Sequence, residues 1–306
     1  MATAVATSNA VDSEDRLRLD PAFLAKLDKL DVHSRKILQG KMKGERRSKR
    51  RGQSVEFADF RNYVPGDDLR FIDWNAYARL DKLFLKLFLE EEDLALSVLV
   101  DVSKSTDYGD PHKLGYLRRV AAALGYVGLV NYNRVSVSAY ADGVVADTGG
   151  LRGRRSVPRL LDFLDQQKPT GSGDLAKACR DFALRHRNKG VVVLLGDLFD
   201  KAGFEEGLRY LLAGRYDVFV VQVLSPQELE PDMKGDLKLI DLEDDDAAEV
   251  SITAPLLRRY KANLDGYCRK VRDYVTRRGG SYLLATTDTP FDELVLTQLR
   301  SRGLLR

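Results

Sequence analysis

Two apolar runs that each end in a carboxylate constrain this chain more than any other feature. The first, residues 96–100, is aliphatic apart from one serine and is followed by Asp101. The second, residues 191–195, is entirely apolar and is followed by Gly196 and Asp197. Continuous apolar runs of this kind are typical of parallel strands buried on both faces of a sheet. Both runs therefore predict central strands of an α/β domain.

Helical patterns alternate with these strands, and this order predicts a doubly wound, mostly parallel sheet of Rossmann-like α/β class. Further strands are expected at residues 134–140, 216–224 and 281–286. Helices are expected at residues 114–132, 157–166, 175–187, 204–213, 255–278 and 291–302. The turn residues Asp142 and Gly143 predict a hairpin between residues 134–140 and 144–146. An acidic stretch, about residues 225–253, predicts an inserted β-hairpin.

The N-terminal part of the chain is expected to lie outside this sheet. Residues 1–18 are small and polar without a periodic apolar face, so we expect them to be disordered. Residues 19–92 are expected to form a helix, a basic loop and an arm, and residues 93–306 the α/β domain. The helix should begin at Pro21 and run to about residue 41. Residues 83–90 predict an edge strand, paired antiparallel with the strand that ends at Asp101.

Side chains with hard oxygen atoms follow the two apolar strands. Asp101, Ser103 and Ser105 alternate after the first, and Asp197 follows the second. The carboxyl ends of strands at a switch point line one crevice, and Mg²⁺ prefers oxygen ligands. The pattern predicts half of a metal site, although a buried strand ending in a solvated polar turn explains Asp101–Ser105 equally simply. Asp174 and Ser172, on a glycine-rich loop before a helix, are further candidates, with helix N-capping as the alternative for Asp174.

Composition and charge exclude several classes of protein. The net charge of +3 gives no overall electrostatic attraction to nucleic acid, and two cysteines are too few and too far apart for a disulfide framework or a zinc site. Neither a signal-peptide core nor an apolar run of about 18 residues is present. We therefore expect a cytoplasmic protein without a membrane span. The basic run at residues 41–51 favours a solvated loop or an arm pairing with nearby acids, with nucleic-acid binding as the alternative.

The densest stretch, residues 56–79, alternates charges and aromatics around a Pro-Gly-Asp-Asp turn. To be structurally ordered, this stretch must either form an internal network of ion pairs or present a surface to a partner, and both interpretations stay open. The residues of interest in this arm are Glu56, Arg61, Asp67, Asp68, Arg70, Asp73 and Trp74.

Several of these motifs together resemble a known family. Asp101-Val-Ser-Lys-Ser105 with the later Gly196-Asp197 resembles the metal-ion-dependent adhesion site of von Willebrand factor type A domains. The series Glu-Phe-Ala-Asp-Phe-Arg, Pro-Gly-Asp-Asp-Leu-Arg and Ile-Asp-Trp within residues 56–74 resembles the hallmark of the bacterial domain-of-unknown-function 58 family. Residues 225–231 and 235–237 are similar to that family as well, so the resemblance covers about residues 21–306.

The resemblance implies a von Willebrand type A-like domain that binds a divalent cation, Mg²⁺ or Mn²⁺, through the serines and aspartates. It also implies a protein-interaction role beside a MoxR-type AAA+ ATPase, in protein remodelling or cofactor insertion. One departure stands out, because Gly173 occupies the place where such sites usually supply a threonine. Ser172 or Thr170 in a shifted loop is the substitute that the sequence offers.

An enzyme is the main alternative. Asp101 after a buried strand suggests a phosphotransferase or phosphatase with that carboxylate as nucleophile, but the acid expected two residues later is replaced by Ser103. The three histidines are scattered, and no P-loop or G-x-S-x-G motif occurs. The sequence therefore favours a non-enzymatic, metal-binding interaction module.

Overall fold

The structure is a computed structural model of the chain, and it describes residues 17, 19–34, 56–89, 94–186, 190–214, 216–232, 235–240 and 247–306. The described residues form two compact units. The larger contains those of residues 1–40 and 94–306, and the smaller contains those of residues 41–93. The predicted disorder of residues 1–18 falls almost wholly outside the described residues, and the basic run at residues 41–51 lies outside them entirely.

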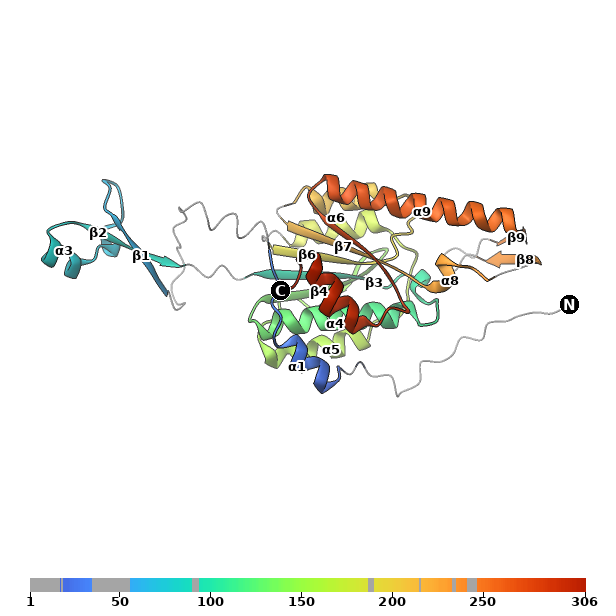
Figure 1. Cartoon of the computed structure of the whole chain (residues 1–306), viewed down its shortest axis with the longest axis horizontal. Coiled ribbons are helices and arrows are strands. Elements are labelled where there is room, and N and C mark those ends of the chain that lie inside the picture. The colour runs from blue at the N-terminus through green and yellow to red at the C-terminus, as the bar shows by residue number, and fades with distance from the viewer. Residues whose placement is uncertain are drawn as a thin grey trace. The chain divides into compact units, whose positions relative to one another are not determined.

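A six-stranded sheet forms the centre of the larger unit, in the order β10-β7-β6-β3-β4-β5. Figure 1 shows this sheet with helices on either side of it. Its strands are β3 (Ala95–Asp101), β4 (Arg134–Ala141), β5 (Gly143–Asp147), β6 (Gly190–Gly196), β7 (Tyr216–Leu224) and β10 (Ser281–Thr286). Neighbouring strands are parallel except for β5, which pairs antiparallel with β4 as the predicted hairpin. The predicted doubly wound α/β class is confirmed.

Helices cover both faces of this sheet. One face carries α1 (Pro21–Leu27), α4 (Lys113–Val130), α5 (Val157–Asp165), α10 (Phe291–Glu293), the π-helical turn η4 (Leu294–Gln298) and α11 (Leu299–Ser301). The other face carries α6 (Leu175–Arg185), α7 (Glu205–Leu212) and α9 (Ala254–Arg277). Each face has its own apolar core, and β3 and β6 contribute side chains to both, as expected for central strands. In the described part of the chain no helix is both long and apolar enough to cross a bilayer.

The switch point of the sheet lies between β3 and β6. The chain passes from β3 to β4 on one side and later to β6 on the other. Val100 pairs with Leu195, so Asp101 at the end of β3 comes to lie beside Gly196 at the end of β6. In open α/β sheets, this is the position where ligand crevices form.

The predicted insertion after β7 is confirmed as a hairpin. The short helix α8 (Pro226–Leu229) follows β7, and then β8 (Gly235–Ile240) pairs antiparallel with β9 (Ala247–Ile252). Tyr260 of α9 donates a hydrogen bond from its hydroxyl to the Glu228 carbonyl at 2.8 Å, which ties α8 to α9. Short 3₁₀ turns, η2 (Lys104–Thr106) and η3 (Arg154–Ser156), complete the larger unit.

The first helix is shorter than predicted, and it belongs to the larger unit. It ends at Leu27, whereas the sequence pattern suggested continuation to about residue 41. The following backbone pairs with the C-terminal end instead: Asp31 and His33 donate to the carbonyls of Arg306 and Leu304, at 3.0 and 2.8 Å. Phe23 of the helix is buried in the core of the larger unit. The helix is therefore part of the α/β core and not of the arm with which it was grouped.

The smaller unit contains β1 (Glu56–Asn62), the 3₁₀ turn η1 (Leu69–Phe71), α3 (Trp74–Leu80) and β2 (Phe84–Leu89). β1 and β2 pair antiparallel with each other. The prediction that β2 pairs with β3 is therefore wrong. The physical reason is that β3 is hydrogen-bonded to β4 along one edge and to β6 along the other, so it has no edge left to offer.

Candidate metal centre

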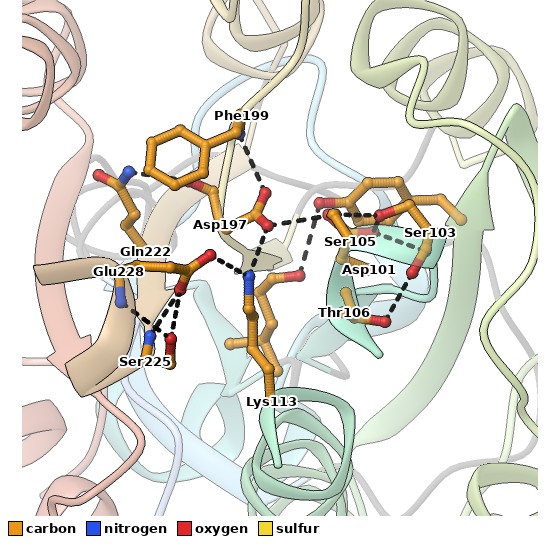
Figure 2. A network of polar contacts seen from close by, with 12 residues as sticks. Asp101, Ser103, Ser105, Thr106, Lys113, Asp197, Phe199, Gln222, Ser225 and Glu228 are labelled. Atoms are coloured by element: carbon orange, nitrogen blue, oxygen red, sulfur yellow. Dashed lines mark hydrogen bonds and ion pairs between the residues drawn. The ribbon is translucent and has the colours of Figure 1, made fainter. Parts of the chain in front are cut away.

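The end of β3 is shaped by the carboxylate of Asp101. Its Oδ1 accepts hydrogen bonds from the backbone N–H of Ser103 at 2.9 Å and from the Ser103 hydroxyl at 2.6 Å. The Thr106 hydroxyl donates to the Ser103 carbonyl at 2.7 Å, which closes the η2 turn (Figure 2). Asp101 and Ser103 are both buried, and Ser105 is half-buried. The polar turn after this strand is thus an ordered structure that faces inward.

A chain of oxygen atoms joins this turn to the neighbouring strand. The Ser103 and Ser105 hydroxyl oxygens are 2.9 Å apart, and the Ser105 hydroxyl donates to Asp197 Oδ2 at 3.2 Å. Asp197 is only 2% exposed, and its Oδ1 accepts from the backbone N–H of Phe199 at 3.0 Å. The structure therefore brings together the four strongest candidate ligands, which the sequence placed on two strands 96 positions apart (101 versus 197) (Figure 2).

Two backbone features allow this convergence. A Cβ on Gly196 would lie 2.5 Å from the Tyr140 hydroxyl and 2.8 Å from Asp101 Oδ2, so only glycine fits there. Leu198 has a φ of 62°, in the left-handed region that branched residues rarely adopt. This turn directs the N–H of Phe199 back toward Asp197. Unfavourable backbone geometry of this kind concentrates at functional sites.

A buried lysine completes the cluster, and the sequence did not predict it. Lys113, the first residue of α4, has 0% exposure. Its Nζ lies 2.9 Å from Asp197 Oδ2 and 2.6 Å from Glu228 Oε1. Glu228 forms a capping box with Ser225 at the start of α8. The Ser-Pro-Gln-Glu sequence of this box was a readable helix-start signal, but it gave no indication that the glutamate reaches the sheet crevice.

The electrostatics of the cluster reflect its burial. Desolvation, helped by the nearby Asp197 carboxylate, raises the pKa of Asp101 to about 7, while the hydrogen bonds from Ser103 oppose this rise. Burial by itself lowers the pKa of Lys113, but the carboxylates of Asp197 and Glu228 together outweigh it, and that pKa is raised. Lys113 is therefore a charged ammonium at neutral pH, held inside the protein by its two carboxylates.

The two weaker candidate ligands have other contacts. Asp174 accepts a hydrogen bond at 2.8 Å from the backbone N–H of Lys177 and so caps α6, which is the alternative that the sequence left open. Ser172 donates to Asp142 Oδ1 at 2.9 Å. Their loop still lies beside the end of β3, because the Thr170 N–H donates to the Val102 carbonyl at 2.7 Å. A metal-binding role for Asp174 and Ser172 stays a prediction.

The charged residues of the arm pair within their own unit. Arg61 contacts Asp67 at 2.7 Å, and Arg70 contacts Asp68 at 2.6 Å. Asp73 accepts from the N–H groups of Asn75 and Ala76 at the start of α3, and it lies 3.3 Å from Lys86 Nζ. Trp74, in contrast, is 59% exposed. Glu56 lies at the start of β1, and its side chain is outside the described residues.

The oxygen donors fit a hard divalent cation. Two buried carboxylates and two hydroxyls converge, which suits Mg²⁺ because this ion usually takes few carboxylates and keeps water in its remaining positions. In the described parts of the chain, no three His, Cys, Asp or Glu side chains gather as a metal-binding group. A cation at this place would therefore depend on the hydroxyls of Ser103 and Ser105 as much as on Asp101 and Asp197.

Comparison with known proteins gives relatives in mycobacteria. The chain is 28% identical over 244 residues to the uncharacterized protein Rv1480 of Mycobacterium tuberculosis, and equally to Mb1516 of Mycobacterium bovis; the match spans 78% of this chain and 76% of each relative. Among solved structures, BatB from Bacteroides thetaiotaomicron aligns with a TM-score of 0.44 at 10% identity, over 69% of this chain and 98% of that protein. An aerotolerance-related membrane protein from Bacteroides fragilis also aligns with a TM-score of 0.44, at 13% identity and over the same shares of the two chains.

The family model with the description "Protein of unknown function DUF58" matches residues 59–266, which include the arm from Asp59 onward, both aspartate-ending strands and the hairpin insertion. This match covers more than half of the chain and agrees with the motifs noted in the sequence. The chain therefore belongs to the DUF58 family.

Proposed function

We propose that the cluster at the ends of β3 and β6 binds a divalent cation, Mg²⁺ or Mn²⁺, and that the protein is a non-enzymatic interaction module. One observation carries the proposal: an unbroken hydrogen-bonded chain of side-chain oxygens runs from Asp101 through Ser103 and Ser105 to Asp197, across the switch point of the sheet. Buried oxygen donors from two strands are a preorganised site for a hard cation.

Asp101, Ser103 and Ser105 would hold the ion from one side, and Asp197 from the other. A bound cation supplies a Lewis-acidic position at which a carboxylate of a partner protein can bind. The protein's own residues orient this position. The Ser103 N–H fixes Asp101, and the Phe199 N–H fixes Asp197, at 2.9 and 3.0 Å respectively.

For the partner we propose an AAA+ ATPase of MoxR type, with this protein as its adaptor in protein remodelling or cofactor insertion. Membership of the DUF58 family and the resemblance to von Willebrand type A domains support this choice. The proposal places the protein in the cytoplasm, where such an ATPase has access to ATP.

A thermal melt tests metal binding. Mg²⁺ or Mn²⁺ should raise the melting temperature, because an ion that binds only the folded state stabilises it by about 2.7 kcal/mol at one hundred times its Kd. Asp101→Ala should abolish the increase. The matched control is Asp162→Ala, which removes an exposed carboxylate from α5 and should leave the increase unchanged. Wild-type protein whose melt neither ion moves would overturn the proposal.

Asp174→Asn and Asp174→Ala separate capping from metal binding. Asparagine caps a helix nearly as well as aspartate, whereas alanine costs about 1 kcal/mol at such a position. If Asp174 only caps α6, both variants keep the metal-dependent increase and only the alanine variant melts lower without metal. If it is also a ligand, both variants lose part of the increase. Ser172→Ala tests the second weak candidate in the same way.

The partner is tested by affinity capture with and without chelator. The bait is the wild-type chain, and Asp101→Ala is the matched control. A MoxR-type ATPase should be captured by wild type in Mg²⁺ and be absent both in chelator and with the variant. Equal capture under all three conditions would contradict a metal-dependent adaptor.

A further inference from the structure

Lys113 is the feature of the site that the proposed function leaves unexplained. It is fully buried at the first position of α4, where a lysine side chain normally extends into water. Its ammonium contacts two carboxylates from different elements, Asp197 after β6 and Glu228 in α8 (Figure 2). A buried charge is retained only when it is paired, so these contacts are what hold the ammonium inside the protein.

The ammonium uses the same oxygen atom that joins Asp197 to the serines. Asp197 Oδ2 accepts from Lys113 Nζ at 2.9 Å and from the Ser105 hydroxyl at 3.2 Å. A single carboxylate oxygen thus separates the lysine cation from the hydroxyl that would contact a metal ion. Two cations on either side of one oxygen repel each other strongly in a water-excluded site.

Glu228 provides a second place for the ammonium. Its Oε2 accepts from the Ser225 N–H at 2.7 Å and from the Ser225 hydroxyl at 3.0 Å, so the carboxylate is held in place independently of the lysine. Its Oε1 is the atom that contacts Lys113, at 2.6 Å. The side chain of Lys113 could therefore give up Asp197 while it keeps a fixed, buried counter-charge.

We propose that Lys113 is a built-in cation of the site, which a divalent ion must displace from Asp197, and that Glu228 retains the displaced ammonium. This inference rests on the proposed function and names how that site is regulated. It predicts effects of opposite sign for the two partners of one ion pair. Removing the ammonium should strengthen metal binding, and removing the glutamate charge should leave the ammonium to Asp197 and weaken metal binding.

The test is Mn²⁺ affinity measured by isothermal titration calorimetry on the full chain. Lys113→Met, which has a similar length, should bind roughly tenfold tighter than wild type, because a unit charge one carboxylate away is removed. Glu228→Gln should bind several-fold more weakly. Lys261 and Glu230 form an exposed ion pair at 2.8 Å, so Lys261→Met and Glu230→Gln are matched controls that should leave the affinity unchanged.

The double variant Lys113→Met with Glu228→Gln separates displacement from net charge. It has the same net charge as wild type but lacks the competing ammonium. Because it removes the Glu228 charge together with that of Lys113, it can be measured even if Lys113→Met alone does not fold. If the ion has to displace Lys113, the double variant should bind Mn²⁺ several-fold more tightly than wild type does. A double variant that binds like wild type would show that only net charge matters and would overturn the inference.

The outcomes also distinguish the inference from the proposed function. If wild type binds Mn²⁺, and if Lys113→Met and the double variant both bind it with the wild-type affinity, the inference is wrong and the proposed metal site stands. If only the variants without Lys113 bind Mn²⁺, the ion does not displace the ammonium in the native chain, and both the displacement and the proposed metal-binding function are wrong. If no variant binds Mn²⁺, both are wrong.

Discussion

Gly196 lies so close to Asp101 that no side chain fits between them. A Cβ at position 196 would be 2.8 Å from Asp101 Oδ2 and 2.9 Å from Asp101 Cβ. Such contacts are far shorter than van der Waals separation. The missing side chain is therefore what allows the end of β6 to approach the end of β3 and the two carboxylates to share one cluster.

Gly196→Ala should disturb both the fold and the site. Overpacking in a closely packed interior typically costs about 1–3 kcal/mol, so the free energy of unfolding should fall by that amount. The added methyl group should also move Asp101 and remove the stabilisation of the folded state by Mn²⁺. Urea unfolding with and without Mn²⁺ measures both effects.

Gly266→Ala is the matched control. Gly266 lies inside α9, and a Cβ there would meet no atom within 4 Å. Alanine is favoured over glycine in a helix by about 1 kcal/mol, so this variant should be slightly more stable and should keep the response to Mn²⁺. A Gly196→Ala protein that keeps its stability and its Mn²⁺ response would refute the steric explanation.

The central sheet was predictable because its signals are local. The apolar runs before Asp101 and Gly196 identify buried strands from a few neighbouring residues each, and the Asp142-Gly143 turn identifies the β4–β5 hairpin. The partner of β2 was not predictable in this way. The pattern of residues 83–90 shows a strand, but the choice of β1 over β3 depends on which strand edges the whole fold leaves open.

The same distinction explains the site. Asp101, Ser103, Ser105 and Asp197 follow strands, so the edge of a parallel sheet brings them together. Lys113 and Glu228 are 115 positions apart, and each has an ordinary local role, one at a helix start and the other in a capping box. Only the packing of α8 against the start of α4 makes them partners.

The start of α3 should depend on pH through Asp73. Hydrogen bonds from the backbone, above all from the Ala76 N–H, and the contact with Lys86 hold the pKa of Asp73 below its ordinary value. The ionised carboxylate therefore stabilises the folded arm above about pH 4, and this contribution is lost as the pH falls through the folded-state pKa. The protection factors of the Asn75 and Ala76 amides, which compare the observed exchange rate with the intrinsic rate at the same pH, should fall on acidification.

Asp73→Asn is the control for this titration. Asparagine keeps a capping oxygen and has no carboxyl group to protonate. The variant should keep protected amides at the first turn of α3 and lose the acid-dependent fall in their protection factors. Identical pH profiles for wild type and Asp73→Asn would contradict the assignment.

Truncation of a buried apolar residue should unfold the arm, whereas truncation of an exposed one should not. Ile72 is 5% exposed and Trp74 is 59% exposed, although they are two positions apart. Ile72→Ala should cost about 2–5 kcal/mol, enough to unfold a small unit. Trp74→Ala should cost far less. Proteolytic cleavage within residues 56–89 measures the difference, and equal protection of the two variants would contradict it.

Helix α1 should contribute to the stability of the larger unit. The Phe23 side chain is buried and packs edge-on against Phe291, with ring centroids 5.0 Å apart. Phe23→Ala should therefore lower the free energy of unfolding by about 3 kcal/mol, in the range for buried phenylalanines. Lys26→Ala, an exposed change in the same helix, is the control. Chemical denaturation that gives equal midpoints for the two variants would place α1 outside the core.

The most direct test of the central claim is the location of a bound ion. Crystals grown with Mn²⁺ and measured at a wavelength with strong manganese anomalous scattering report the position of the ion independently of any protein contact. We predict one anomalous peak between Asp101, Ser103, Ser105 and Asp197, and its absence from crystals of Asp101→Ala. A peak elsewhere, or no peak in wild-type crystals at saturating Mn²⁺, would contradict the metal site.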